Sequence, residues 1–252
     1  MNVWLPIVFA ILGYLVGSIS SARLVARLAR SDEKLADGTK LSLEGSDATL
    51  TLETVSATSV SVRLGSSYGF LTYVLDMLKI VVPMVLIRHF FPGEPYYLIV
   101  ATAGVVGHVW PVFHGFKGGR GLSAIYGALL VIDWPGLFVT SILGMIFGLF
   151  VVRSVAVAYM AGPWFIMPWV WFRTHDPAIL AWAIVANIVF TISAIPELRQ
   201  WLKIRKEDKW NDPAEVIQLS GMGRGILKMA KKLGIVKVPK VSPPPPAGEN
   251  VE

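Results

Sequence analysis

The stretch GHVWPVFHGFKGGRGLSA, residues 107–124, joins two strongly apolar segments of the chain. In its second half, glycines at positions 118, 119 and 121 are interleaved with Lys117 and Arg120. Glycine lets backbone N–H groups approach a ligand closely, and N–H groups near the start of a helix form an anion site. The pattern therefore predicts a phosphate-binding loop. The alternative from composition alone is a plain turn whose cations follow the positive-inside rule.

The composition around this stretch is that of a membrane protein. Of 252 residues, 54% are hydrophobic and 16% are charged, whereas soluble domains carry about 25% charged residues. The mean hydropathy is +0.59. There is no cysteine, and the four histidines lack ligand-type spacing, so no metal site is predicted. The net charge of +6 is assigned to cytoplasmic loops rather than to nucleic-acid binding.

Apolar runs of suitable length predict an all-α polytopic fold of about seven transmembrane helices. The run Gly121–Val152 is broken at Asp133-Trp134-Pro135, because proline disfavours a continuing helix, and is interpreted as two short spans. Six spans remain the alternative if this run is not a full hairpin. The other predicted spans are Leu5–Leu24, Tyr68–Phe90, Pro95–Phe113, Ser154–Phe172 and Ala178–Ile195. An outside N-terminus and a cytoplasmic C-terminus place most Lys and Arg residues inside.

Two regions are predicted to lie outside the membrane. Residues 32–67 are polar and largely alternate in the run KLSLEGSDATLTLETVSATSVSVRL, which predicts a small β-like hairpin at the cytoplasmic surface. Residues 1–197 are accordingly assigned to a membrane domain that contains this insertion. Residues 198–252 form a basic cytoplasmic tail with a short amphipathic helix and a Pro-rich, disordered end.

The tract from Gly107 to Gly121 resembles a signature of the bacterial membrane-integral glycerol-3-phosphate acyltransferases of the PlsY type, with Arg120 where that family usually has Lys. The segments Gly13–Leu28 and YGFLTYVLDMLKI, residues 68–80, are similar to the family's first and second spans. The resemblance implies acyl transfer from acyl phosphate to the 1-hydroxyl of glycerol 3-phosphate. The products would be lysophosphatidate and phosphate, with no cofactor or metal. Acyl phosphate, glycerol 3-phosphate and membrane lipids are the expected partners.

We assign the site residues accordingly. The expected catalytic residues are His108, Lys117 and Arg120, and the expected phosphate ligands are Lys117, Gly118, Gly119, Arg120, Gly121 and Arg63. Support is expected from Ser18, Asp76, Lys79 and Ser46. Asp76 and Lys79 share one helix face and are predicted to neutralise each other. His108 and Ser18 also have plainer interpretations as helix-packing residues.

Several positions depart from the family pattern. Ser59 stands where the family has Asn, and the His and Asn of the family's last motif correspond to Ala194 and Glu197. Two hypotheses therefore stay open: a divergent acyltransferase, and a non-catalytic or altered-substrate lipid-binding protein that keeps the fold and the phosphate loop. A small transporter ranks last, because the spans carry few polar residues and no inverted repeat is visible.

Overall fold

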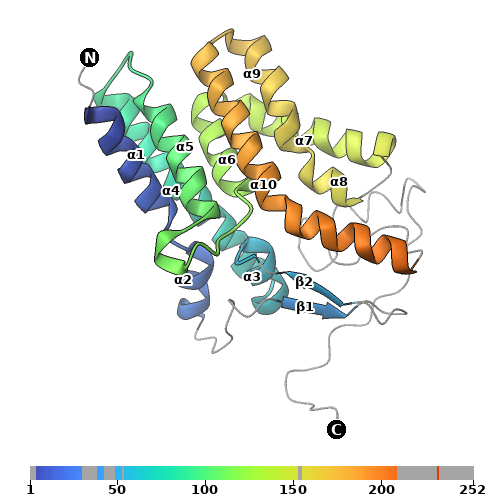
Figure 1. Cartoon of the computed structure of the whole chain (residues 1–252). Coiled ribbons are helices and arrows are strands. Elements are labelled where there is room, and N and C mark those ends of the chain that lie inside the picture. Colours follow the sequence, from blue (N-terminus) through green and yellow to red (C-terminus); the bar gives the residue numbers. More distant parts are fainter. Residues whose placement is uncertain are drawn as a thin grey trace.

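The computed structural model of the chain is a bundle of helices with one two-stranded sheet, and it describes residues 4–29, 39–42, 49–52, 54–152, 155–208 and 232 (Figure 1). The elements in chain order are α1 (Trp4–Gly17), α2 (Ser21–Leu28), β1 (Thr39–Ser42), β2 (Thr49–Leu52), α3 (Ala57–Leu64), α4 (Ser66–Phe90), α5 (Tyr96–Val109), the 3-10 turn η2 (Val112–His114), α6 (Leu122–Ile132), α7 (Trp134–Ile146), the π-helical η3 (Phe147–Val152), α8 (Val155–Met160), the 3-10 turn η4 (Gly162–Phe165), α9 (Ile166–Thr174) and α10 (Pro177–Asp208).

Helix α5 lies at the centre of the bundle and contacts α1, α4, α6 and α10. The α1–α5 contact is the most extensive between described elements, and glycines line it. A Cβ atom added to Gly17 would lie 2.2 Å from the carbonyl oxygen of Gly104, and one added to Gly13 would lie 2.5 Å from that of Val100. Such small-residue seams let membrane helices approach backbone to backbone.

Five helical segments are long and apolar enough to cross a membrane: Trp4–Leu28, Ser66–Phe90, Tyr96–His114, Trp134–Val152 and Pro177–Pro196. Large apolar side chains such as Ile11, Phe138 and Ile188 lie exposed on the outer faces of these helices. An exposed apolar surface of this extent suits a hydrocarbon environment. The fold is therefore that of a multi-pass helical membrane protein.

The break predicted at Asp133 is confirmed, since α6 ends at Ile132 and α7 begins at Trp134 with Pro135 in its first turn. Helix α6, with 11 residues, is shorter than the candidate spans. The predicted span Ser154–Phe172 is divided among α8, η4 and most of α9, and Pro163 lies near the start of η4. Seven complete crossings thus remain a prediction.

The structure interrupts the first predicted span, because α1 ends at Gly17 and α2 begins only at Ser21. The Ser20 side chain accepts a hydrogen bond from the backbone N–H of Arg23, which caps α2. Serine side chains compete with helical backbone bonds in this way, and they favour helix ends. Between α1 and α2, backbone groups such as the Ile19 carbonyl therefore lack a partner in a continuous helix.

The predicted β-like segment is part strand and part helix. β1 pairs with β2 in antiparallel register, with Thr39 opposite Leu52 and Ser42 opposite Thr49. The prediction was wrong for the end of the segment, where Ala57–Leu64 forms α3. Ser59 Oγ accepts from the Ser56 N–H at 2.9 Å, and this local bond starts the helix despite the alternating sequence.

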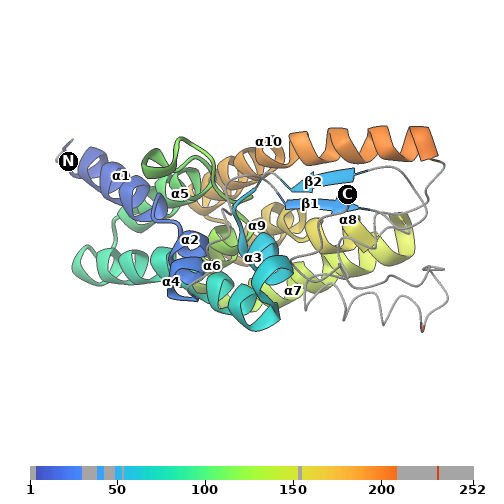
Figure 2. The same cartoon turned by 90° about the horizontal axis from the view of Figure 1, so that it is seen from below.

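Helix α10 runs without interruption across the predicted domain boundary at residue 197 and continues to Asp208. Figure 2 shows the β1–β2 pair lying alongside the second half of this helix, in agreement with the contacts between β2 and α10. The predicted amphipathic helix and Pro-rich end of the tail fall outside the described residues, apart from position 232.

Candidate functional site

A small pocket lies where the α1–α2 interruption, the middle of α4, the C-terminal end of α5 and residues 117–121 meet. We call residues 117–121 the glycine-cation loop. The lining combines backbone-rich positions with three ionisable side chains: Gly17, Ser18, Ile19, Ser20, Ser21, Ala22, Val55, Asp76, Lys79, His108, Pro111, Gly118 and Gly119. The pocket therefore joins segments that lie up to about 100 residues apart in the chain.

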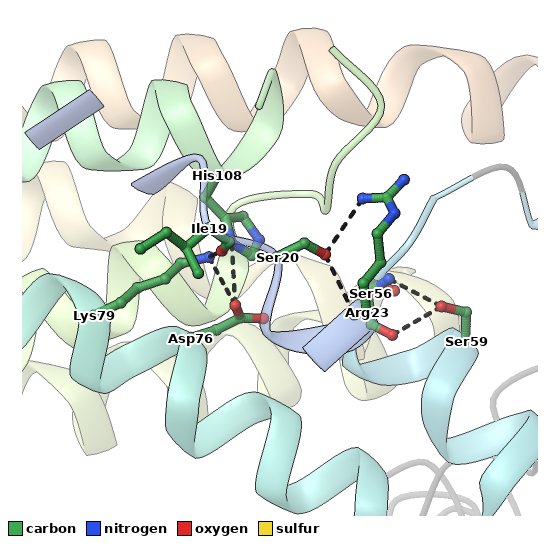
Figure 3. A network of polar contacts seen from close by, with 8 residues as sticks. All are labelled: Ile19, Ser20, Arg23, Ser56, Ser59, Asp76, Lys79 and His108. Carbon is green, nitrogen blue, oxygen red and sulfur yellow. Dashed lines mark hydrogen bonds and ion pairs between the residues drawn. The ribbon is translucent and has the colours of Figure 1, made fainter. Parts of the chain in front are cut away.

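Three ionisable side chains, Asp76, Lys79 and His108, form one wall of the pocket (Figure 3). Lys79 Nζ lies 2.8 Å from Asp76 Oδ1, which confirms the predicted ion pair, and it also donates to the carbonyl oxygen of Ile19 at 2.8 Å. His108 Nδ1 lies 3.5 Å from the same Asp76 oxygen, an electrostatic contact too long for a strong hydrogen bond. All three side chains are at most 9% exposed, so the buried charges of Asp76 and Lys79 depend on each other. Lys79 thereby satisfies a carbonyl that the helix interruption leaves without a helical partner.

His108 contacts the glycine-cation loop through both its carbonyl oxygen and its ring. The Gly119 N–H donates to the His108 carbonyl oxygen at 3.1 Å. A Cβ atom added to Gly119 would lie 2.4 Å from His108 Nε2, and one added to Gly118 would lie 2.2 Å from the His108 carbonyl oxygen. The loop can therefore rest on His108 only because both positions are glycine.

Three carbonyl oxygens of the loop accept hydrogen bonds from other parts of the bundle. The Lys117 oxygen accepts from Arg23 Nη2 at 3.2 Å, and the Gly118 oxygen accepts from the Val55 N–H at 3.2 Å. The Arg120 oxygen lies 2.9 Å from Ser193 Oγ on α10, whose single hydroxyl proton is shared between this oxygen and the Phe190 carbonyl oxygen at 2.7 Å. The loop is thus fixed from α2, from the segment before α3, and from α10.

The predicted cations Lys117, Arg120 and Arg63 are not among the residues that line the pocket. Lys117 is exposed, Arg120 is half-buried at the loop, and Arg63 is half-buried in the last turn of α3. Gly121 has a left-handed backbone (φ 89°) and precedes α6, as expected for a loop that opens a helix. Ser46 falls outside the described residues.

Ser18 has a defined structural role. Its hydroxyl donates to the Tyr14 carbonyl oxygen at 2.8 Å and accepts from the Val112 N–H at 3.4 Å. It therefore joins the end of α1 to the segment that leads into the loop. The sequence interpretation missed Ser20, Arg23, Val55 and Ser193. The Ser20-Ser21 pair is a recognisable helix-capping signal, whereas nothing local marks Val55 or Ser193.

The sequence matches the glycerol-3-phosphate acyltransferase family over residues 7–203. The chain belongs to this family. The expectation drawn from the glycine-cation tract is thereby confirmed at the level of the family.

Individual family members agree with this assignment. The glycerol-3-phosphate acyltransferase of Proteus mirabilis (strain HI4320) is 31% identical over 219 residues, which cover 82% of this chain and 92% of that protein. The glycerol-3-phosphate acyltransferase of Desulfotalea psychrophila is 37% identical over 130 residues, which cover 50% of this chain and 59% of that protein.

Two crystal structures of PlsY (YgiH), an integral membrane glycerol 3-phosphate acyltransferase, share the fold. The glycerol 3-phosphate form has a TM-score of 0.65 at 25% identity, and the lysophosphatidic acid form has 0.63 at 26%. Each comparison covers 79% of this chain and 93% of the other. This protein therefore shares the fold of these two structures over most of its length.

Proposed function

We propose that this protein transfers an acyl group from acyl phosphate to the 1-hydroxyl of glycerol 3-phosphate in phospholipid biosynthesis. The observation that carries the proposal is the glycine-cation loop, whose main chain is fixed on His108 beside a pocket that also contains Lys79. Family membership supports it. Both substrates carry phosphate, which suits backbone N–H donors and fixed cations.

The reaction needs neither a metal nor a redox step. The hydroxyl oxygen of glycerol 3-phosphate forms a bond to the acyl carbonyl carbon, and the bond between that carbon and the phosphate oxygen breaks. The electron pair leaves with the phosphate, which can also take up the hydroxyl proton. The protein then has to align the two substrates and stabilise the developing negative charge.

In this proposal, the N–H groups of the glycine-cation loop bind phosphate oxygens. Lys117 and Arg120 extend over the substrates from the pocket rim, and Arg63 contributes a further cation. His108 acts chiefly by holding Gly119 in place, because its ring lies against this residue. Lys79 supplies positive charge in the pocket wall, while Asp76 and Ser18 fix their neighbours.

We further propose seven crossings, with the N-terminus outside and the loop and C-terminus at the cytoplasmic face. Arg23, Lys117 and Arg120 lie at the loop end of the bundle. Arg88 and Arg173 lie near the α6–α7 turn, which is the other end of α6. This asymmetry supports the orientation. Cysteine labelling at position 115 and at position 93 should show opposite accessibility in intact cells.

The activity is tested with purified protein, glycerol 3-phosphate and a series of acyl phosphates of different chain length. We expect formation of lysophosphatidate and stoichiometric release of phosphate. Lys117→Ala and Arg120→Ala should each lower kcat/KM by at least about tenfold, because each removes a charge that faces phosphate. Arg173→Ala at the other end of the bundle is the control, and its kcat/KM should match that of the wild type.

A second candidate function is non-catalytic lipid binding. It is favoured by Ala194, which occupies the place of a family histidine and follows Ser193, the residue that contacts the loop. This function would be supported if native mass spectrometry showed a retained phospholipid and the protein turned over no acyl phosphate.

A further inference from the structure

Arg23 lies in the first turn of α2, and its side chain leaves this helix to contact the glycine-cation loop. Its Nη2 donates to the Lys117 carbonyl oxygen at 3.2 Å, and its Nη1 donates to Ser20 Oγ at 3.3 Å. The backbone N–H of Arg23 donates to the same Ser20 oxygen (Figure 3). One guanidinium thereby joins the start of α2 to main-chain atoms that are 94 residues away in sequence.

The Lys117 carbonyl belongs to a peptide group whose other end is the Gly118 N–H. A trans peptide is planar, so its C=O and N–H bonds point in opposite directions. Because Arg23 holds the carbonyl on one side, the Gly118 N–H is turned to the other. Gly118 lines the pocket, and this N–H has no hydrogen-bond partner within the described part of the chain. It is therefore a donor held ready for an anion.

The carbonyl oxygens of Gly118 and Arg120 also accept hydrogen bonds from outside the loop, but from uncharged donors. The Val55 N–H holds the Gly118 carbonyl, and the opposed Gly119 N–H is used by the His108 carbonyl. The Ser193 hydroxyl contacts the Arg120 carbonyl, but it shares its one proton with the Phe190 carbonyl. Among these three donors Arg23 alone is charged, and hydrogen bonds from charged donors are about twice as strong as neutral ones.

We propose that Arg23 is a positioning residue of the phosphate site: by fixing the Lys117–Gly118 peptide plane, it aims the Gly118 N–H at a substrate phosphate. This inference deepens the proposed function and rests on it for the identity of the substrate. The competing explanation is that Arg23 only adds positive charge near the site. The two differ for Arg23→Lys, because lysine keeps the charge but lacks the planar fork that reaches two acceptors at once.

The experiment measures phosphate binding separately from turnover. Inorganic phosphate and glycerol 3-phosphate are titrated calorimetrically into detergent-solubilised wild type, Arg23→Ala, Arg23→Lys and Arg88→Ala. Arg88 is the matched control, since its Nη1 donates to the Val131 carbonyl at 2.9 Å at the other end of α6. We expect the Kd for phosphate to rise about tenfold in Arg23→Ala and at least about threefold in Arg23→Lys. The Kd of Arg88→Ala should equal that of the wild type.

Kinetics add a second readout. For Arg23→Ala, KM should rise more than kcat falls, and the thermal midpoint should drop no further than in Arg88→Ala. If Arg23→Ala does not fold, Arg23→Lys carries the test, because it keeps the charge and most of the length of the side chain.

Equal phosphate affinity in Arg23→Lys and wild type would overturn the proposal in favour of simple charge. It would also fall if Arg23→Ala bound phosphate as tightly as Arg88→Ala, or if the wild type did not bind phosphate. By contrast, weakened binding in both Arg23 variants, combined with no lysophosphatidate from the wild type, would support the role of Arg23 and reject the acyltransferase function.

Discussion

Replacing Gly119 by alanine tests whether the glycine-cation loop needs its close approach to His108. The added Cβ atom would lie 2.4 Å from His108 Nε2 and 3.0 Å from Cε1, whereas ordinary contacts begin near 3.4 Å. The loop or the ring must therefore move by about 1 Å, within the scale of misplacement that lowers rates by about a hundredfold. The imidazole has little freedom to move, because His108 is only 6% exposed and its Nδ1 faces Asp76.

The expected stability cost of Gly119→Ala is about 1–3 kcal/mol, as for an overpacked core position. The expected kinetic cost is about a hundredfold in kcat/KM for acyl phosphate, measured by phosphate release from protein in nanodiscs. Gly115→Ala is the matched control in the same connection. Its backbone is left-handed (φ 60°), but nothing lies within 4 Å of its added Cβ. It should lose about 1–2 kcal/mol of stability and keep its kcat/KM.

A double-mutant cycle separates the steric cause from a general disturbance. If the clash with the ring is responsible, Gly119→Ala should cost much less in a His108→Ala background than in the wild type. Wild-type kcat/KM in Gly119→Ala would refute the reasoning, and so would an equal loss in Gly115→Ala.

Three further outcomes concern stability. Asp76→Ala should destabilise the fold by about 3–5 kcal/mol by leaving Lys79 buried without its partner, and Lys79→Met added to it should raise the thermal midpoint again. Gly17→Val should prevent assembly of the bundle, because its Cβ would lie 2.2 Å from a carbonyl oxygen of α5; size-exclusion chromatography would detect this, and a monodisperse native variant would contradict it. Asp133→Ala should cost about 1–3 kcal/mol by removing the acceptor of Trp169 Nε1, with an unchanged KM for glycerol 3-phosphate.

The features that could be predicted from the sequence are those with a local cause. Proline fixes its own backbone, so the break before Pro135 follows from the residue type. Asp76 and Lys79 meet because helix geometry brings positions i and i+3 together. The glycine tract predicted a loop that opens a helix, and Gly121 has the backbone conformation that this requires.

The remaining features depend on contacts between distant segments. The alternating residues of α3 could pair as a strand or pack as a helix, and the choice was made by Ser59 and by packing of Val60 into a small core with Val25. The carbonyl of Arg120 is held by Ser193, 73 residues away, and no sequence periodicity marks such a pair. The site prediction therefore listed the cations of the loop and missed the residues that hold its main chain.

The anchoring of the glycine-cation loop from α2, α10 and the segment before α3 has a consequence for protein engineering. Under the proposed function, the affinity for phosphate depends on these anchors as well as on the motif, so grafting residues 107–121 onto a different pair of helices should yield a connection without useful binding. A working transplant would have to carry three distant donors along with it. Variation among relatives at the two side-chain donors, Arg23 and Ser193, should accordingly tune substrate affinity without altering a single atom in contact with the substrate.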